Sequence, residues 1–200
     1  MAKIRLIGIT GGIATGKSAV CEMIKKFGIP LIDFDILSRK AVEPEKPAWK
    51  DITAYFGASV LNKDKSINRQ ALKKIVFDNP AKLKKLESFI HPRIKKDFIN
   101  LTETYFKKKP DGIIQAGVPL LIETNMTEMF DYIILVWLPF EEQIKRVIKR
   151  DKISYEQAEK IIASQMPIND KKKYANFIID NSGSLQNTEK QVAELMKILA

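Results

Sequence analysis

The chain has 200 residues, 45% of them hydrophobic, and no apolar run approaches the roughly 18 residues of a membrane span, so we expect one ordinary domain without a membrane partner. Its formal net charge of +10 would suit nucleic acid, but only six of its 34 basic residues are arginine, and the lysine runs 107–109 and 171–173 are expected on solvated helix faces, which argues against a nucleic-acid partner. The chain begins without a signal-peptide pattern, and its single cysteine, Cys21, rules out an internal disulfide and is expected to be a buried structural thiol, so we expect a cytoplasmic protein.

The first predicted elements are an apolar strand at 4–9 and an amphipathic helix that carries Val20, Met23, Ile24 and Phe27. Between them lies the pattern G-x-x-x-x-G-K-[ST], with Gly11, Gly16, Lys17 and Ser18 on its defined positions. Backbone N–H groups in such a loop surround a polyphosphate, while the lysine reaches the β/γ oxygens and the hydroxyl holds Mg²⁺. The alternative is a glycine-rich turn before an ordinary helix. We therefore predict nucleoside triphosphate binding by the loop residues Gly11, Gly12, Ile13, Ala14, Thr15, Gly16, Lys17, Ser18 and Ala19.

A short apolar strand is predicted at 29–32, after a helix stop at Gly28, and Asp33 and Asp35 follow it. Ligands of open α/β sheets bind beyond the carboxyl ends of the strands. We therefore expect Asp33 to lie near the phosphates. The alternative is that Asp33 only caps the helix that begins near Ile36.

From 36 to 110 the spacing of apolar residues is helical and predicts no strand. An insertion of this length beside a phosphate-loop core is a natural place for a second substrate. His91 precedes Pro92 at the predicted start of the last helix, where it is either a helix-entry residue or a catalytic group, and its spacing supplies no metal cluster. The predicted helices are 47–56, 69–77, 81–90 and 92–106.

Three further strands are predicted at 112–116, 132–138 and 176–181, which completes a parallel α/β sheet. Helices are predicted at 140–151, at 155–166 behind Ser154, and from a capping box at Thr188 and Gln191 to the end. Arg146 and Arg150 are four residues apart and share a helix face with Gln143. Such arginines suit a lid, 140–167, that closes over phosphates; the alternative is a solvated basic face.

Taken together, these motifs resemble the dephospho-CoA kinase family over nearly the whole chain. The residues that carry the resemblance are, in chain order, Gly8 to Ile13 before Gly16, Lys17 and Ser18; Asp33 to Asp35 with Arg39; Asn68 to Leu72 before Val76 and Phe77; Leu86 and Glu87 before His91 and Pro92; Val118 to Leu121 with Glu123; Gln143 with Arg146, Arg150 and Asp151; Gln165; and Asn181 to Gly183.

The resemblance implies an α/β fold: a P-loop kinase core with a five-stranded parallel sheet flanked by helices, within a single domain of residues 1–200. It implies that 36–110 is a helical substrate-binding insertion and that 140–167 is a helical lid. The implied activity is transfer of the γ-phosphoryl group of ATP to the ribose 3′-hydroxyl of dephospho-CoA, with Mg²⁺, in the last step of coenzyme A synthesis. ATP and dephospho-CoA are the implied substrates, and we expect a monomer with at most weak self-association.

The resemblance also assigns roles to residues. The catalytic group comprises Lys17, Asp33 and Arg146, with Ser18 at the metal. Arg146, Arg150 and Asn181 join the loop in binding the nucleotide. The acceptor is expected to contact Asp33, Asp35, Arg39, Arg69, His91, Pro119 and Leu120.

The loop departs from the family at two positions, with Ala14 where a third glycine is usual and Ala19 where a threonine is usual. We expect Ala14 to be tolerated if its position does not need a positive φ. A hydroxyl that could touch a phosphate oxygen is lost at Ala19, so we expect at most weaker nucleotide contacts.

Three other functions are considered. A kinase for another small acceptor, such as a nucleoside or nucleotide, would share the loop, lid and acid. A GTP-dependent switch or an ATPase module would need N-K-x-D for guanine, and residues 62–65 misplace the acid of that pattern. A basic nucleic-acid-binding protein is favoured by net charge alone.

Overall fold

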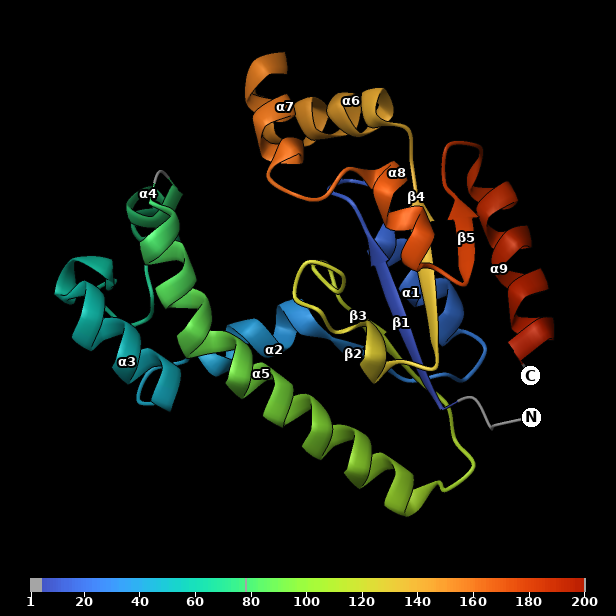
Figure 1. The fold of residues 1–200 in the computed structure, drawn as a ribbon, viewed down its shortest axis with the longest axis horizontal. Coiled ribbons are helices and arrows are strands. Elements are labelled where there is room, and N and C mark those ends of the chain that lie inside the picture. The colour runs from blue at the N-terminus through green and yellow to red at the C-terminus, as the bar shows by residue number, and fades with distance from the viewer. Residues whose placement is uncertain (1–4, 78, 200) are drawn as a thin grey trace. The chain divides into compact units, whose positions relative to one another are not determined.

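The structure is a computed structural model that describes residues 5–77 and 79–199. The chain forms two units (Figure 1), one made of the residues up to Asp33 together with those from Asp111 onward, and the other of Phe34–Pro110. Ile4, the first residue of the first predicted strand, lies outside the described residues.

The first unit is built on a five-stranded sheet in which every neighbouring pair is parallel, with the order β2-β3-β1-β4-β5. The predicted five-stranded parallel sheet is confirmed. All five carboxyl ends differ from the prediction: the first strand ends at Gly11 rather than at residue 9, and each of the other four ends one residue away from its predicted end. Asp33 is therefore the last residue of its strand rather than the residue after it, and the third strand ends at Gly117. The strands are β1 (Leu6–Gly11), β2 (Leu31–Asp33), β3 (Ile114–Gly117), β4 (Tyr132–Trp137) and β5 (Phe177–Asp180).

Helices α1 (Lys17–Lys25) and α9 (Leu185–Leu199) share one face of this sheet. Alternate residues of β1 and β4 point to this face, so Ile7, Ile9, Ile134 and Val136 meet the apolar stripes of both helices. The cluster also contains Cys21, which is 1% exposed, as expected of a buried structural thiol. This packing fixes α1, and therefore the end of the loop that leads into it.

The opposite face of β1 is covered by the chain segment that follows β3. A Cβ atom on Gly8 would lie 2.6 Å from Cδ1 of Leu121 and 2.9 Å from Cγ of Phe130. Both of these side chains are buried. Glycine is therefore needed at this point of β1, because the segment after β3 packs directly on the strand backbone.

Five more helical segments complete the described part of the first unit: α6 (Phe140–Asp151), α7 (Tyr155–Ala163), the single turn α8 (Ile168–Lys171), and the short 3₁₀ turns at Thr127–Met129 and Lys172–Tyr174. Figure 1 shows α6 and α7 side by side beyond the carboxyl end of β4. Ser154 and Gln157 form a complete capping box at the start of α7. The hairpin that α6 and α7 form thus stands at the edge of the sheet where ligands bind in this class of fold.

The prediction for the last helix was wrong at its start. Helix α9 begins at Leu185, and the hydroxyl of Ser184 accepts a hydrogen bond of 3.2 Å from the amide of Asn187. Thr188, the predicted cap, is 1% exposed and donates its hydroxyl to Oδ1 of Asn181 at 2.8 Å. Capping-box spacing alone cannot reveal such a contact, because Asn181 is brought to Thr188 by the turn that joins β5 to α9.

The second unit contains α2 (Phe34–Ala41), α3 (Pro47–Phe56), α4 (Arg69–Phe77) and α5 (Pro80–Lys108), with a 3₁₀ turn at Ala58–Val60. Its core cluster joins α3, α4 and the amino-terminal half of α5, and the rings of Phe34 and Phe98 join α2 to α5 with 5.1 Å between centroids. An ion pair of 2.6 Å between Arg93 and Asp51 adds a polar link from α5 to α3. Within 34–110, the described residues form no strand beyond an isolated bridge between Leu61 and Ile67.

The helices predicted at 81–90 and 92–106 are one continuous helix, α5, with Pro92 inside it. A proline removes one helical hydrogen bond and usually ends or kinks a helix, which is why the sequence favoured a break. Packing of α5 along its length against α2, α3 and α4 outweighs that cost. His91 is therefore an exposed residue of a helix interior, and the expectation of a helix-entry position was wrong. In the described parts of the chain, no helix is both long enough and apolar enough to span a bilayer.

Candidate functional site

The loop between β1 and α1 is closed by its own hydrogen bonds. The carbonyl of Gly12 accepts from the amide of Thr15 at 3.3 Å and from its hydroxyl at 2.9 Å. The carbonyl of Gly16 accepts from the amides of Ala19 and Val20 at 3.0 and 3.2 Å, which starts the helix. Two carbonyl groups of the turn are therefore occupied by hydrogen bonds within the turn and the start of α1.

Three side chains from later parts of the chain hold three further loop carbonyls. Arg146 of α6 donates to the carbonyl of Ala14 at 3.4 Å, and Asn181 donates to that of Thr15 at 2.7 Å. Lys171 of α8 donates to the carbonyl of Gly11 at 3.3 Å. In a trans peptide the N–H points away from the preceding C=O, so holding the carbonyls outward turns the neighbouring amides inward, toward an anion.

The first turn of α1 adds amides that need an outside acceptor. Gly16 stands at the N-cap with φ of +93° and supplies no side-chain cap. The first N–H groups of a helix have no partner within it, and the helix dipole favours negative charge there. The end of the loop is therefore built for an anion such as phosphate.

The ammonium group of Lys17 is buried, and among the described residues it has no hydrogen-bond partner. It lies 3.3 Å from the point where a Cβ atom on Gly117 would stand, at the carboxyl end of β3. A buried cation without a hydrogen-bond partner is costly in free energy unless a ligand supplies an acceptor with the opposite charge. The position of Lys17 thus fits a polyphosphate seated on the loop amides.

Asp33 stands at the same edge of the sheet as Lys17. Its strand β2 pairs with β3 so that Asp33 lies opposite Gly117, the residue next to the Lys17 ammonium. Cys21 Sγ would lie 3.4 Å from the same Cβ position. Burial raises the pKa of the Cys21 thiol to about 12, with the positive charge of Lys17 lowering it and the negative charge of Asp33 raising it further. The thiol is therefore protonated at neutral pH and does not serve as a nucleophile.

The two arginines of α6 differ in their surroundings. Arg146 donates to the carbonyl of Asn181 at 2.9 Å as well as to Ala14, so it lies against the loop. Arg150 is held by its neighbour Asp151 through two hydrogen bonds of 2.7 and 2.8 Å, which raise the pKa of its guanidinium. Arg146 therefore contacts the phosphate-binding loop, the loop between β1 and α1. That Arg150 binds a phosphate stays a prediction.

Two predicted acceptor residues lie in the segment after β3. The carbonyl of Pro119 accepts from the hydroxyl of Thr10, at the end of β1, at 3.3 Å. Leu120 follows and is half-buried, and its carbonyl accepts from the hydroxyl of Thr124 at 2.7 Å. Both residues are thus near the start of the loop, and their contact with an acceptor stays a prediction.

The other predicted acceptor residues belong to the second unit and are exposed there. Asp35 lies in the first turn of α2, Arg39 in its last turn, and Arg69 opens α4. His91 lies within α5. The contact that each residue would make with an acceptor remains a prediction.

Ser18, the predicted metal residue, is exposed in the first turn of α1 beside Lys17. Among the residues that the structure describes, no three His, Cys, Asp or Glu side chains gather where they could hold a metal ion. Mg²⁺ at a nucleotide site takes one or two protein ligands and completes its shell with phosphate oxygens and water. A single exposed hydroxyl beside the phosphate loop fits that requirement.

The condition set for Ala14 is not met. We expected the alanine to be tolerated if its position does not need a positive φ, and its φ is +61°. A side chain in the left-handed region costs roughly 1–2 kcal/mol relative to the right-handed one, which is why glycine is favoured there. Hydrogen bonds to the flanking loop residues, together with packing of Ala14 against α6 and α7, hold this strained conformation.

Sequence reasoning missed Lys171. It was expected on a solvated face with Lys172 and Lys173, but it is 0% exposed and forms an ion pair of 2.8 Å with Oε1 of Glu123. A run of three lysines carries no periodicity that separates a buried one from its neighbours. Glu123 was part of the motif evidence, yet its partner lies 48 residues away in the chain and is set only by the fold.

Gln143 also has a structural role that its position on the Arg146 face did not reveal. It is 1% exposed and donates to the carbonyl of Leu138 at 2.9 Å. A Cβ atom on Gly12 would lie 2.6 Å from its Oε1 atom. Helix α6 thus packs directly on the backbone of the loop at Gly12.

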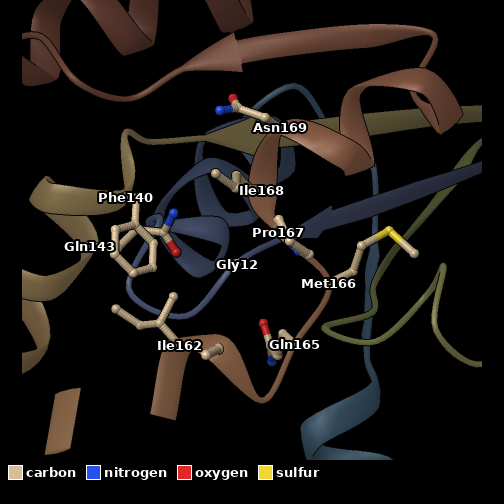
Figure 2. Close-up of a pocket in the computed structure, with 10 residues that line it drawn as sticks. Gly12, Phe140, Gln143, Ile162, Gln165, Met166, Pro167, Ile168 and Asn169 are labelled. Carbon is tan, nitrogen blue, oxygen red and sulfur yellow. The ribbon is translucent and has the colours of Figure 1, made fainter. Parts of the chain in front are cut away.

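A cavity of about 320 Å³ opens beside Gly12, and its walls come from α6, α7 and the segment that leads to α8. Figure 2 shows Phe140, Gln143 and Ile162 on one side of it and Met166 on the other. The walls are mainly apolar, and the buried Oε1 atom of Gln165 has no hydrogen-bond partner among the described residues. The cavity therefore adjoins the loop at the side of the α6–α7 hairpin.

Comparisons with known proteins agree with this geometry. The family model described as dephospho-CoA kinase matches residues 5–187. The dephospho-CoA kinase of Listeria monocytogenes is 42% identical over 188 residues, which is 94% of both chains. A solved structure from Thermus thermophilus superposes with a TM-score of 0.82 at 30% identity and covers 99% of both chains. The dephospho-CoA kinase of Campylobacter jejuni superposes with a TM-score of 0.71 at 29% identity, over 96% of this chain and 95% of that one.

Proposed function

The chain belongs to the dephospho-CoA kinase family, and on that premise we propose that it transfers the γ-phosphoryl group of ATP to the ribose 3′-hydroxyl of dephospho-CoA. The products are coenzyme A and ADP, in the last step of coenzyme A synthesis. The observation that carries the proposal is the buried ammonium of Lys17, which has no hydrogen-bond partner among the described residues and lies beside Gly117, the residue that pairs with Asp33.

The chemistry of phosphoryl transfer is mainly positioning and stabilisation of negative charge. In this role Lys17 and the loop amides would neutralise the β/γ oxygens, and Arg146 would approach from α6. Mg²⁺ held at Ser18 would neutralise part of the phosphate charge. A single well-placed donor is worth roughly 10²–10³ in rate by analogy with oxyanion stabilisation.

Asp33 would accept a hydrogen bond from the ribose hydroxyl. A carboxylate is far too weak a base to remove the proton of an alcohol before the reaction begins. Its contribution is to orient the hydroxyl toward the γ-phosphorus and to take the proton late, as a loose transition state allows. The phosphate donor is thus assigned to the loop after β1 and the acceptor hydroxyl to Asp33 of β2, two strands that lie on either side of β3.

We assign the acceptor's remaining contacts to the second unit and to the segment after β3. Arg39 and Arg69 carry charges suited to the phosphates of dephospho-CoA. Asp35, His91, Pro119 and Leu120 complete the proposed acceptor site, and Arg150 and Asn181 complete the nucleotide site. We further propose that the protein acts as a cytoplasmic monomer, which its single free and buried thiol, Cys21, suits.

The test is to incubate the purified chain with ATP, Mg²⁺ and dephospho-CoA and to measure the product mass. We expect a product heavier by one phosphate and a matching release of ADP. The variant Lys17→Ala should lose ATP use, and Lys26→Ala, which removes an exposed lysine at the other end of α1, should not. Phosphoryl transfer to nucleosides or nucleotides, with none to dephospho-CoA, would show that the protein is a kinase for another small acceptor. Undiminished turnover in Lys17→Ala would show that the loop is not the nucleotide site.

A further inference from the structure

Lys171 is a fully buried lysine at the end of α8, and each of its partners belongs to a different segment. Its ammonium donates to the carbonyl of Gly11 at 3.3 Å and pairs with Oε1 of Glu123 at 2.8 Å. The same Oε1 atom accepts from the amide of Met166 at 3.2 Å. Three segments meet at this one ion pair: the start of the phosphate-binding loop, the segment after β3, and the segment that joins α7 to α8.

The burial of this pair argues for a specific role. Removing an ammonium from water costs several kcal/mol, and a buried ion pair often stabilises a protein no more than apolar residues of the same volume would. Lysine at this point therefore needs a reason beyond filling space. The hydrogen bond to Gly11 supplies one, because an apolar side chain could fill the volume but could not hold a carbonyl.

We propose that Lys171 is a positioning residue that fixes the peptide between Gly11 and Gly12 and thereby sets the first amide of the phosphate-binding loop. The proposal rests on the proposed function, in which that loop holds the phosphates of ATP. Because the peptide is planar and trans, a carbonyl held by Lys171 directs the N–H of Gly12 to the opposite side. Glu123 holds the ammonium in place through the ion pair.

The other anchors of the loop support this division of roles. Arg146 and Asn181 hold the carbonyls of Ala14 and Thr15, in the second half of the loop. In the first half, Lys171 holds the carbonyl of Gly11 from outside the loop, whereas the carbonyl of Gly12 is held from within it by Thr15. Without Lys171, the peptide after β1 can rotate, and the loop would present its amides to phosphate less well although the rest of the turn is intact.

The experiment compares ATP affinity and steady-state kinetics in the full chain and in variants of the pair. Lys171→Met alone leaves the carboxylate of Glu123 unpaired in a poorly solvated place, and Glu123→Gln alone leaves a buried ammonium unpaired. The informative variant is therefore the double change K171M/E123Q, which removes both charges. Lys173→Met is the matched control, because it removes an exposed lysine two residues away.

We expect K171M/E123Q to bind Mg²⁺–ATP at least tenfold more weakly by titration calorimetry and to show a raised KM for ATP. Its KM for dephospho-CoA should stay within twofold of the wild-type value, and Lys173→Met should match the wild type in every measurement. A purely structural role would lower the melting temperature without this selective loss. Unchanged ATP affinity in the folded double variant would overturn the proposal, and so would failure of both single variants and the double variant to fold.

The affinity measurement needs no acceptor, so it separates the two proposals. A wild-type chain that binds ATP but leaves dephospho-CoA unphosphorylated would overturn the proposed function, while the comparison with K171M/E123Q still tests Lys171. A wild-type chain that does not bind ATP would overturn both.

Discussion

The side-chain amide of Asn181 donates a hydrogen bond of 2.7 Å to the carbonyl of Thr15, and so joins the residue after β5 to the phosphate-binding loop. Asn181 is held in turn, because its Oδ1 atom accepts from the hydroxyl of Thr188 at 2.8 Å and its carbonyl accepts from Arg146 at 2.9 Å. Asn181 was predicted to bind the nucleotide directly. The observed contacts let it act on the nucleotide through the shape of the loop.

The first prediction concerns this contact. Asn181→Asp keeps the acceptor for Thr188 but cannot donate to Thr15, so we expect ATP affinity to fall about tenfold, the value of one lost hydrogen bond of about 1–1.5 kcal/mol. Thr188→Val removes only the hydroxyl that orients Asn181, and a smaller loss in the same direction is expected. Both affinities are measured by titration with Mg²⁺–ATP. Equal affinity in Asn181→Asp and the wild type would show that the loop keeps its shape without this bond.

The second prediction concerns Asp33. Asp33→Asn keeps the size of the side chain but can no longer accept the proton of the ribose hydroxyl, so phosphoryl transfer should fall by orders of magnitude while ATP binding remains. The two quantities are measured by ADP release in a coupled assay and by ATP titration. An unimpaired rate would exclude Asp33 from the mechanism.

The third prediction separates the two arginines of α6. Arg146 touches the loop, so Arg146→Met should lower kcat roughly 10²–10³-fold if its charge faces the transferred group. Arg150 is paired with Asp151 in the structure. Arg150→Met should therefore lower kcat more than Arg146→Met does only if the ion pair with Asp151 opens when the nucleotide binds. The values of kcat for the two variants, measured in the steady state, show which arginine contributes more. A normal rate in Arg146→Met would remove it from the catalytic group.

The fourth prediction concerns the strained residue Ala14. Since its φ is +61°, Ala14→Gly should raise the free energy of unfolding by about 0.5–1 kcal/mol, after allowing for the greater chain entropy of glycine. Ala19→Gly, in the first turns of α1, is the control and should lower that free energy by a similar amount. Denaturant unfolding of both variants measures the difference. A stability loss in Ala14→Gly would mean that the methyl contact with α6 and α7 outweighs the strain.

The fifth prediction follows from the pKa of Cys21, which burial raises from 9.0 to about 12. Between these values the unfolded chain has lost the thiol proton and the folded chain still binds it, so the free energy of unfolding falls as pH rises from 9 toward 12. The slope approaches about 1.4 kcal/mol per pH unit for this group. Cys21→Ala should lose stability less steeply than the wild type over this range in denaturant titrations at each pH. Parallel slopes for the two proteins would contradict the shifted pKa.

The elements whose pattern is local were predicted well. Each of the five strands combines apolar or β-branched residues with a turn at its end. The phosphate-binding loop lies between a strand and a helix, as its sequence pattern requires. The errors fall where a distant contact overrides the local pattern. Pro92 was read as a break because its own helix loses a hydrogen bond there, yet packing along α5 keeps the helix continuous, and Thr188 was read as a cap although its hydroxyl is bound by Asn181.

The sequence by itself determined the nature of the ligand, because the spacing of Gly11, Gly16, Lys17 and Ser18 encodes a local backbone shape whose amides can only face an anion. Only the tertiary structure decided which side chains hold that shape. The contacts of Lys171 with Glu123, of Lys171 with Gly11 and of Asn181 with Thr15 join residues that are 48, 160 and 166 positions apart in the chain. The sequence around a charged or polar residue does not indicate whether the fold will bury it beside a carbonyl or leave it in water. Charge and hydrogen bonding act over a few ångströms of space, so the loop's anchors appear only once the strands have brought them together.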